Sequence, residues 1–485
     1  MALTISDADV LRELVRDLKS DATGEELILE IRPAGLSQSP LARVIGEVDD
    51  WKALGHAIAA NTTSKMLGLR NFRTRELTAM AEGLKLSIAL EILVLSYNTV
   101  EDAFAKVLGE VMASNTSLKE LRLAKCDLKD SSLSLLAEGI ELNTTLERLD
   151  LSSNVFVDAG AKTLAQVLAS PRASLRELRL HSCGIGAAGL TALALSMKLN
   201  SKLEVLVLSS NHFGDAGVEV LGVQVLGGAN TALKELRLMD CSIGAAALTA
   251  LADGMRKNSA LTLEILDVSR NNFGDDGAKT LGEILAYNTR LRELRFHHCI
   301  IGPARLQAFA AAMKPNTMLE VLDVSNNNFG DDGAFALAHV LSLMKSLKEL
   351  HLGDCGVLVE GGRAIGRAWG GNWALKDLSF IFNSRNDGCD ERTLLYGAEQ
   401  VRRSDKLLCF GMGIHPRQGG SADKCGDDGM VGEGENFTLQ ALDADIFRLI
   451  GDAYTIHDPT TLREGGGVRE NVAGGVFDFW EPRGE

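Results

Sequence analysis

The chain has 485 residues, of which 46% are hydrophobic but only 5% aromatic, so its core must consist mainly of Leu, Ala, Val and Ile. Its net charge is -15, from 65 acidic and 50 basic residues, which argues against nonspecific binding to nucleic acid or to an anionic membrane. Residues 1–20 are charged and contain no apolar signal core, and no run of about eighteen apolar residues occurs elsewhere. We therefore expect a soluble, cytoplasmic protein.

The first 63 residues predict a cap on the N-terminal end of a repeat array. Residues 6–18 have the apolar spacing of an amphipathic helix, and residues 25–33 have that of a strand. A second helix is predicted over residues 49–63, and it leads into a degenerate repeat at residues 64–72. Because a solenoid must cover its terminal core, we interpret residues 1–63 as this cap and a partial repeat.

Residues 64–410 carry a repeat in which leucines recur as LxxLxLxx, followed by Asn or Cys at the ninth position. Successive copies begin 28 to 30 residues apart, which is typical of a leucine-rich solenoid. Each copy predicts a short strand with inward leucines, then a loop and a helix. The predicted fold class is α/β, a horseshoe with a parallel inner sheet and helices on the convex face. The eleven clear copies begin at Leu90, Leu118, Leu146, Leu175, Leu203, Leu233, Leu263, Leu291, Leu319, Leu347 and Leu375.

Polar residues recur at both ends of the predicted helices. An Asp follows each ninth-position Asn by four residues, and we expect it to cap the helix that begins there and to meet the positive end of the helix dipole. An Asn precedes many copies by three residues, and we expect it to end the helix in the left-handed conformation. The aspartates are Asp102, Asp158, Asp215, Asp275 and Asp331. The asparagines are Asn115, Asn143, Asn200, Asn230, Asn288, Asn316 and Asn372.

Asn and Cys alternate strictly at the ninth position. This alternation, in units of 28 to 30 residues, resembles the ribonuclease-inhibitor-like class of leucine-rich repeats over about residues 60 to 410. The class includes ribonuclease inhibitor, the repeat regions of NOD-like receptors and the Ran GTPase-activating proteins, so the resemblance implies a fold rather than one function. The ninth-position residues are Asn98, Cys126, Asn154, Cys183, Asn211, Cys241, Asn271, Cys299, Asn327, Cys355 and Asn383.

The ninth-position cysteines lie in alternate repeats. Strands stack about 4.8 Å apart, so neighbouring members of this set should be roughly 10 Å apart, beyond disulfide reach. We expect buried, reduced thiols, which fit a cytosolic setting. The triplet His297, His298 and Cys299 resembles a metal site, but adjacent strand residues face opposite ways, and we expect neither a metal site nor a catalytic dyad. No phosphate-binding loop or catalytic constellation stands apart from the repeats, so we expect no enzymatic activity and no cofactor.

The fifth position of each repeat lies between two inward leucines and should project from the inner sheet. The second position alternates between Glu and Lys or Arg, and cysteine-type repeats carry Glu at the third. Two interpretations stay open: a self-paired charge ladder that keeps the sheet soluble, worth about 0–1 kcal/mol per pair, or a docking surface of balanced charge for a protein. The candidate partner-binding residues are Arg122, Asp150, Arg179, Arg237, Asp267, Arg295, His297, Asp323 and His351.

Residues 411–485 depart from the repeat and contain 15 glycines, 14 acidic and 6 basic residues. A Gly-rich linker precedes a possible capping helix at residues 438–451 and the aromatic cluster Phe477, Phe479 and Trp480. One interpretation is that the helix and the aromatic residues cap the last repeat. Another is that this aromatic, acidic tail motif binds a partner or the protein's own concave face.

These patterns favour a non-enzymatic protein–protein interaction scaffold or adaptor that uses its concave face and strand-end loops. The resemblance also implies an alternative, a GTPase activator of the Ran type with a small GTPase as its partner. The loops at residues 271–277 and 326–333 look similar, but every Asn-type repeat has such a loop, and the long acidic tail of that family is replaced here. A nuclease inhibitor is a third possibility, although the member that names the class has an acidic inner face.

Overall fold

The computed structural model describes residues 2–6, 8–21, 23–31, 47–198, 200–228, 230–313 and 318–380. The chain divides into two units, Met1–Arg417 and Gln418–Glu485, and all of the described residues lie in the first. The predicted tail motif, Phe477, Phe479 and Trp480, lies outside the described residues, as does the segment proposed as a capping helix.

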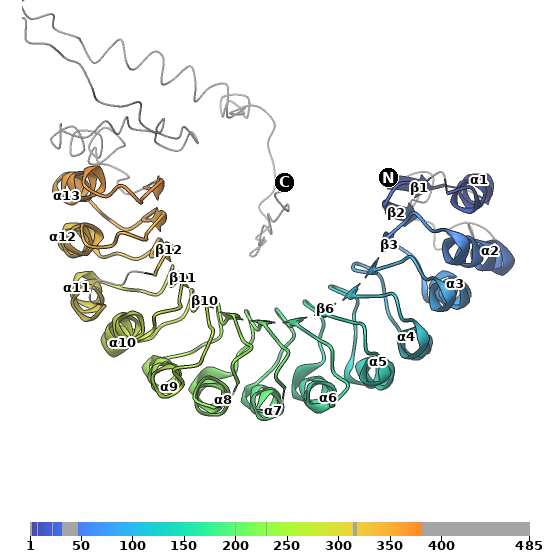
Figure 1. Cartoon of the computed structure of the whole chain (residues 1–485), viewed down its shortest axis with the longest axis horizontal. Coiled ribbons are helices and arrows are strands. Elements are labelled where there is room, and N and C mark those ends of the chain that lie inside the picture. Colours follow the sequence, from blue (N-terminus) through green and yellow to red (C-terminus); the bar gives the residue numbers. More distant parts are fainter. Residues whose placement is uncertain are drawn as a thin grey trace, which may run out of the picture. The chain divides into compact units, whose positions relative to one another are not determined.

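Strands and helices alternate along the described chain (Figure 1). The strands are β1 (Ala2–Ile5), β2 (Glu26–Ile31), β3 (Met66–Arg70), β4 (Ile92–Val94), β5 (Glu120–Arg122), β6 (Arg148–Asp150), β7 (Glu177–Arg179), β8 (Val205–Val207), β9 (Glu235–Arg237), β10 (Ile265–Asp267), β11 (Glu293–Arg295), β12 (Val321–Asp323), β13 (Glu349–His351) and β14 (Asp377–Ser379). The helices are α1 (Ala8–Lys19), α2 (Val48–Ala60), α3 (Thr74–Leu86), α4 (Asp102–Ser114), α5 (Asp130–Leu142), α6 (Val157–Ala169), α7 (Ala187–Met197), α8 (Gly214–Leu221), α9 (Ala245–Lys257), α10 (Gly274–Tyr287), α11 (Pro303–Ala312), α12 (Gly330–Leu341) and α13 (Val359–Gly370), with a π-helical turn η1 (Gly222–Leu226).

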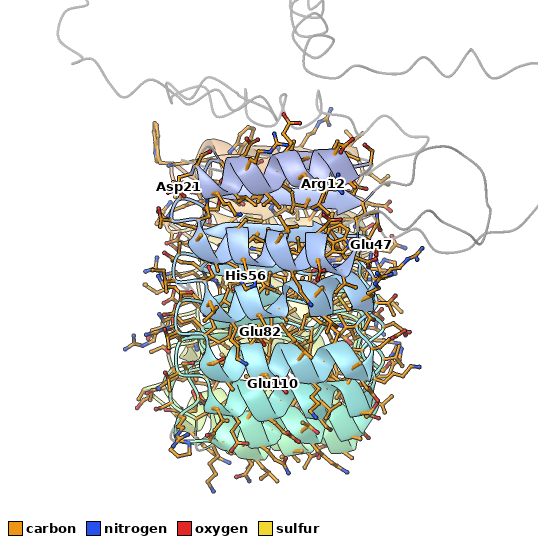
Figure 2. The ribbon with its side chains drawn as sticks, turned by 90° about the vertical axis from the view of Figure 1, so that its right-hand side faces the viewer. Arg12, Asp21, Glu47, His56, Glu82 and Glu110 are labelled. Carbon is orange, nitrogen blue, oxygen red and sulfur yellow. The ribbon has the colours of Figure 1, made fainter. Side chains whose placement is uncertain are left out.

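All fourteen described strands form one parallel sheet in chain order. The register is constant, so the fourth-position leucines stand opposite one another, as Leu121, Leu149 and Leu178 do. The strands line the inner side of the arc and the helices its outer side (Figure 1). Figure 2 shows the first helices side by side with parallel axes, and Glu82 and Glu110 on their outer surface. This is the predicted α/β horseshoe.

The core follows from the repeat. Leucines at the first, fourth and sixth positions are buried, as Leu146, Leu149 and Leu151 show with 0–1% exposure. Each helix adds apolar residues at a helical spacing, such as Leu164 and Leu168 of α6. Complete burial of one such side chain contributes about 1.5–3 kcal/mol. Because each repeat packs only on its neighbours, the core is continuous along the array.

The ninth-position asparagines form a buried ladder that joins successive repeats. The Nδ2 atom of Asn154 donates to the carbonyl oxygens of Leu151 (2.7 Å) in its own repeat and Leu123 (2.8 Å) in the preceding one. Its Oδ1 accepts from the N–H groups of Cys126 (2.9 Å) and Leu128 (3.0 Å). The amide thus satisfies four backbone groups where the chain turns away from the sheet. Asn211, Asn271 and Asn327 do the same. Asn98 binds two carbonyl oxygens and the N–H group of Phe72.

The asparagines at the helix ends act differently from the prediction. Asn115 and Asn143 have extended backbones, with φ of -73° and -75°, so the expectation of a left-handed cap is wrong. Their side chains instead form a second ladder. Asn143 Nδ2 donates to Met112 O (2.7 Å) and Asn115 O (3.1 Å), and its Oδ1 accepts from Leu146 N (2.7 Å). Buried Asn satisfies the last carbonyls of the preceding helix, which explains why Asn is used there.

The helix-start aspartates also act between repeats. Asp158 does not cap α6; its Oδ1 accepts from the N–H groups of Gly186 (2.7 Å) and Gly189 (2.9 Å), which begin α7 in the following repeat. Asp215 binds Gly244 N (2.5 Å) before α9 in the same way. The sequence predicted the right side-chain chemistry but the wrong helix, because the adjacent helix start is visible only when repeats are stacked. The side chain of Asp275 lies outside the description.

Two features were not predicted. Residues Ala2–Ile5 form strand β1, which pairs in parallel with β2 and extends the sheet to the start of the chain. The repeat that begins at Leu203 is 30 residues long, and its helical half continues from α8 into the π-helical turn η1. A π-helical turn takes up extra residues without a change in the strand register.

The five ninth-position cysteines are buried and free, as predicted. Each thiol donates to carbonyl oxygens, as Cys126 Sγ does to Leu95 O at 3.2 Å. Burial raises the pKa of all five thiols to about 12. These cysteines therefore complete the core and are not nucleophiles.

We predict that Asn154→Ala destabilises the protein by about 3 kcal/mol, because four buried backbone groups lose their partner. Chemical denaturation would measure the change. Gln166→Ala, on the exposed face of α6 in the same repeat, is the control and should change stability by less than about 0.5 kcal/mol. Equal effects of the two substitutions would contradict a structural role for the ladder.

We also predict that these five cysteines resist alkylation in the native protein. At pH 8.5, iodoacetamide should modify them at least about a hundredfold more slowly than in the unfolded chain, as mass spectrometry of the peptides would show. Because the folded thiols hold their protons to a higher pH than the ordinary pKa of 9.0, their contribution to stability is complete below about pH 9 and falls as the pH rises toward about 12. Rapid labelling of the folded protein would contradict this.

Candidate functional site

The concave face, defined here as the third and fifth repeat positions of β4 to β13, consists of side chains on the inner side of the sheet. The fourth-position leucine between them is buried, and strand side chains alternate, so these two positions share the opposite face. The fifth positions stand in register: Arg122 aligns with Asp150 and Asp150 with Arg179. The row continues through Val207 to Arg237, Asp267, Arg295, Asp323 and His351. The structure therefore brings the predicted fifth-position residues together in one row.

The arginines of this row pair within their own strands. Arg237 Nε lies 2.5 Å from Glu235 Oε1, and Arg295 Nε lies 2.5 Å from Glu293 Oε1. Arg122 and Arg179 pair with the third-position glutamates of their strands in the same way. The fifth-position aspartates instead accept from backbone N–H groups two residues further on; Asp267 Oδ1 accepts from Ser269 N at 3.0 Å. Arginines and aspartates thus alternate along the row, but each of them binds a group of its own repeat and not its neighbour in the row.

A ladder of charges between strands does exist at the second position. Lys119 Nζ lies 2.7 Å from a carboxylate oxygen of Glu91. In the same way, Lys234 Nζ lies 2.6 Å from Glu204 Oε2, and Lys348 Nζ lies 2.6 Å from Glu320 Oε2. The hydrogen bond from Lys234 is the largest cause of a lowered pKa at Glu204. Lys119, Lys234 and Lys348 are about half exposed, so each pair contributes about 0–1 kcal/mol. Here the self-paired interpretation holds.

Charge is distributed unevenly along the concave face. On β5 to β7 the third and fifth positions hold three carboxylates and three arginines. On β9 to β13 they hold five carboxylates and two arginines. The arginine side chains are also more accessible in the first group, with 46% exposure for Arg122 and 50% for Arg179 against 28% for Arg237 and 35% for Arg295. Counted on the third and fifth positions alone, the first half of the concave face is balanced in charge and the second half is acidic.

His297 lies in the acidic half, at the seventh position. Its ring is half-buried, and burial lowers its pKa, while the charges of Asp323 and Asp267 act to raise it. The neighbouring members of the triplet have different surroundings: His298 is exposed with φ of 54°, and Cys299 is buried with its thiol directed to Val268 O and His297 O. Among the described residues, no group of three or more His, Cys, Asp or Glu is placed to hold a metal ion.

The strand-end loops, defined here as repeat positions eight to twelve, adjoin the concave face. The eighth residue has a positive φ in both repeat types, as Ser153 (57°) and Ser182 (55°) show. At this left-handed residue the chain turns away from the sheet, directly before the buried ninth-position Asn or Cys. Sequence reasoning missed it, although the small and polar residues common at this position are a usable signal.

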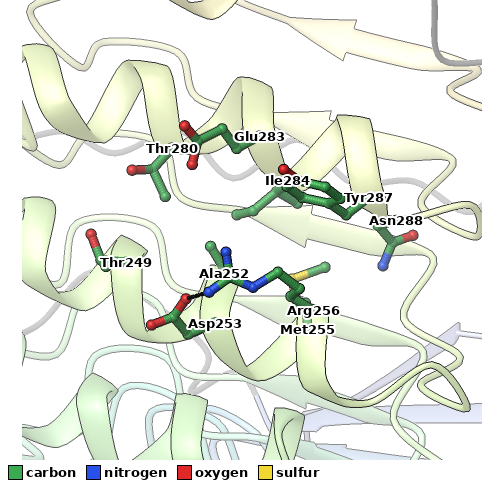
Figure 3. A pocket seen from close by; sticks show the side chains of 10 residues that line it. All are labelled: Thr249, Ala252, Asp253, Met255, Arg256, Thr280, Glu283, Ile284, Tyr287 and Asn288. Atoms are coloured by element: carbon green, nitrogen blue, oxygen red, sulfur yellow. Dashed lines mark hydrogen bonds and ion pairs between the residues drawn. The ribbon is translucent and has the colours of Figure 1, made fainter. Parts of the chain in front are cut away.

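The helices of the convex side border two hollows of very different size. A cleft of about 40 Å³ between α9 and α10, lined by Arg256, Tyr287 and neighbouring residues, is large enough for only a few water molecules (Figure 3). Arg256 pairs there with Asp253 of its own helix (Figure 3). A wider, open groove of about 400 Å³ lies between α11 and α12, beside Phe335. No helix in the described ranges is both long and apolar enough to span a membrane.

Comparison with known proteins agrees with the repeat assignment. The Leucine Rich repeat family model matches residues 114–137, 142–165, 173–194, 199–222, 229–252, 259–282, 316–338 and 344–366. Each match begins at, or a few residues after, the end of one helix and runs through the next strand and loop into the following helix.

Three relatives show which class of repeat this is. Ribonuclease inhibitor from Sus scrofa is 32% identical over 48% of this chain and 51% of its own length. Ribonuclease inhibitor from Mus musculus is 30% identical over 60% of this chain and 63% of its own. "NACHT, LRR and PYD domains-containing protein 14" from Homo sapiens is 30% identical over 50% of this chain and 22% of its own. The chain thus spans about half the length of the pig inhibitor and a smaller part of the human protein. Together with the alternating Asn and Cys ladder, these matches establish that the chain is a ribonuclease-inhibitor-like leucine-rich repeat protein.

Proposed function

We propose that this protein is a non-enzymatic, cytoplasmic scaffold that binds another protein through its concave face and strand-end loops. The observation that carries the proposal is the row of fifth-position side chains from Arg122 to His351, held in register on one sheet and polar on every strand except β8, which contributes Val207. Two of the relatives are named ribonuclease inhibitors, and the target in that name is itself a protein, which supports a protein ligand here.

The concave face suits a large partner because it is rigid before binding. Both asparagine ladders fix the backbone, and each fifth-position arginine is already held by a third-position glutamate. Binding therefore requires little additional ordering of side chains, which lowers its entropic cost. The charges then determine the orientation and the rate of association more than the affinity.

The two halves of the face favour different contacts. The accessible Arg122 and Arg179 suit carboxylates of a partner. The five carboxylates and two arginines on β9 to β13 suit a basic surface that also places a carboxylate opposite Arg237 and Arg295. Arg237 and Arg295 are the two cations within that acidic half. Burial acts to lower the pKa of Arg237, but Glu235 and other nearby carboxylates outweigh it and raise the pKa, so this arginine stays charged.

We predict that Arg237→Glu/Arg295→Glu abolishes partner binding without unfolding the protein. The new glutamates lie beside Glu235 and Glu293 and reverse the local charge, while the leucine core is unchanged. Native affinity capture with mass spectrometry should recover a stoichiometric partner with the wild type and at least about tenfold less with the variant.

The matched control makes the same change of charge on the convex side. Arg256→Glu/Lys279→Glu changes two exposed side chains on the convex helices α9 and α10 and should retain the partner. Thermal denaturation of both variants would verify folding. Retention of the partner by the concave variant would contradict binding through this face, and recovery of no stoichiometric partner by the wild type would contradict the scaffold itself.

A further inference from the structure

One strand-end loop differs from its siblings. The residue after the ninth-position asparagine is polar in four of the five Asn-type repeats described, namely Thr99, His212, Asn272 and Asn328, but it is Val155 in the fifth. Three residues after the asparagine, the later repeats carry Gly214, Gly274 and Gly330, whereas this one carries Val157. Val155 is 69% exposed and Val157 43% exposed. Among the described strand-end loops, Ile300 and Leu358 of the Cys-type repeats are also exposed, but each stands alone, whereas Val155 and Val157 expose two apolar side chains in one loop.

Val157 occupies this position against its own conformational preference. Its φ is 35°, in the positive region that the equivalent Gly214, Gly274 and Gly330 adopt with φ of 58° to 63°. A β-branched residue in this region is strained. Two side chains of the loop hold it there: Asn154 binds the preceding loop and Asp158 the following one. A strained, exposed apolar side chain contributes nothing to the core, so the strain points to a use for the side chain.

The loops that precede and follow the two valines differ in charge. The preceding loop, which Asn154 joins at Cys126 and Leu128, presents exposed Lys125 and Lys129 and one exposed carboxylate, Asp127.

The following loop, residues 182–188, contains no charged side chain. It approaches Val157 closely: a Cβ atom built on Gly184 would lie 3.3 Å from Val157 Cγ1. The carboxylates of Asp130 and Asp158 are occupied by backbone N–H groups of Gly160 and Gly186. The two valines therefore lie between a predominantly basic loop on one side and an uncharged loop on the other.

We propose that Val155 and Val157 form a docking site for a protein segment in which a large apolar side chain lies next to a carboxylate. The apolar side chain contacts the two valines beside Gly184, which has no side chain to cover them, and the carboxylate pairs with Lys125 or Lys129. This proposal rests on the proposed scaffold function, and it places part of the binding energy at the strand-end edge of β6 and α6, outside the concave row.

The test uses the full-length chain and a displayed library of random peptides as the probe. The comparison variant is Val155→Asn/Val157→Gly, which converts this loop to the sequence NNFGD that the chain itself contains at residues 271–275. Peptides selected on the wild type should carry an aromatic or large aliphatic residue beside Asp or Glu. They should bind the variant at least about tenfold more weakly. Lys125→Glu/Lys129→Glu should also weaken them, and so should added salt.

The variant also provides its own folding control. Because glycine relieves the strain at position 157, Val155→Asn/Val157→Gly should melt about 1–3 °C above the wild type, so weaker binding would not arise from unfolding. The reverse variant Arg270→Ser/Asn272→Val/Gly274→Val places the same apolar pair beside Asp240 and removes Arg270, the exposed cation that stands where the first loop has Ser153. A Cβ at Gly274 meets no atom within 4 Å, so this variant fits sterically and bears only the backbone strain.

The outcomes separate this proposal from the scaffold proposal. Peptide binding that is lost with the loop variant, kept by Arg237→Glu/Arg295→Glu, and not transferred to the loop at Gly274 would support the site. The proposal is overturned if the peptides bind wild type and loop variant equally, if the selected sequences are basic or lack an apolar residue, if the transferred valines bind them equally well, or if no peptide is selected. Partner capture through the concave face is a separate measurement, so either proposal can fail alone.

Discussion

The described structure depends on one constraint, the need to satisfy backbone groups that become buried where each strand turns toward its helix. The ninth-position asparagine meets it with a single amide that binds two carbonyls and two N–H groups from adjacent repeats. In the cysteine-type repeats the thiol donates to carbonyl oxygens at the same place. Because each unpaired buried group is expensive, this network fixes both the turn and the stacking of neighbouring repeats.

A fixed stacking determines where charges lie. The constant register puts all fifth positions in one row and all second positions in another, and it leaves only the side-chain torsions free. Arginine then binds the glutamate two residues earlier in its own strand, while the lysines of the second position reach across to the preceding repeat. The same periodic sequence therefore produces a self-paired edge and a row of charges that is set to meet a partner.

A rigid array also tolerates local variation in its loops. The strand-end loop at Val155 and Val157 is held on one side by Asn154 and on the other by Asp158, so a strained valine persists at a position where sibling repeats use glycine. The energy that keeps it there comes from neighbouring repeats and not from the loop itself. Individual loops are thus free to acquire specific surfaces without a change in the scaffold.

The sequence by itself determined the horseshoe, the repeat boundaries, the buried cysteines and the row of fifth-position charges, because these follow from a local period and from side-chain alternation. Only the tertiary structure decided which group each polar residue binds. Asp158 caps the following helix, and Asn143 binds the preceding one, since residues about a repeat apart in sequence lie side by side in space. The strain at Val157 and the unequal exposure of Arg122 and Arg237 were hidden for the same reason: both depend on the neighbouring repeats and on backbone angles that a sequence period does not specify.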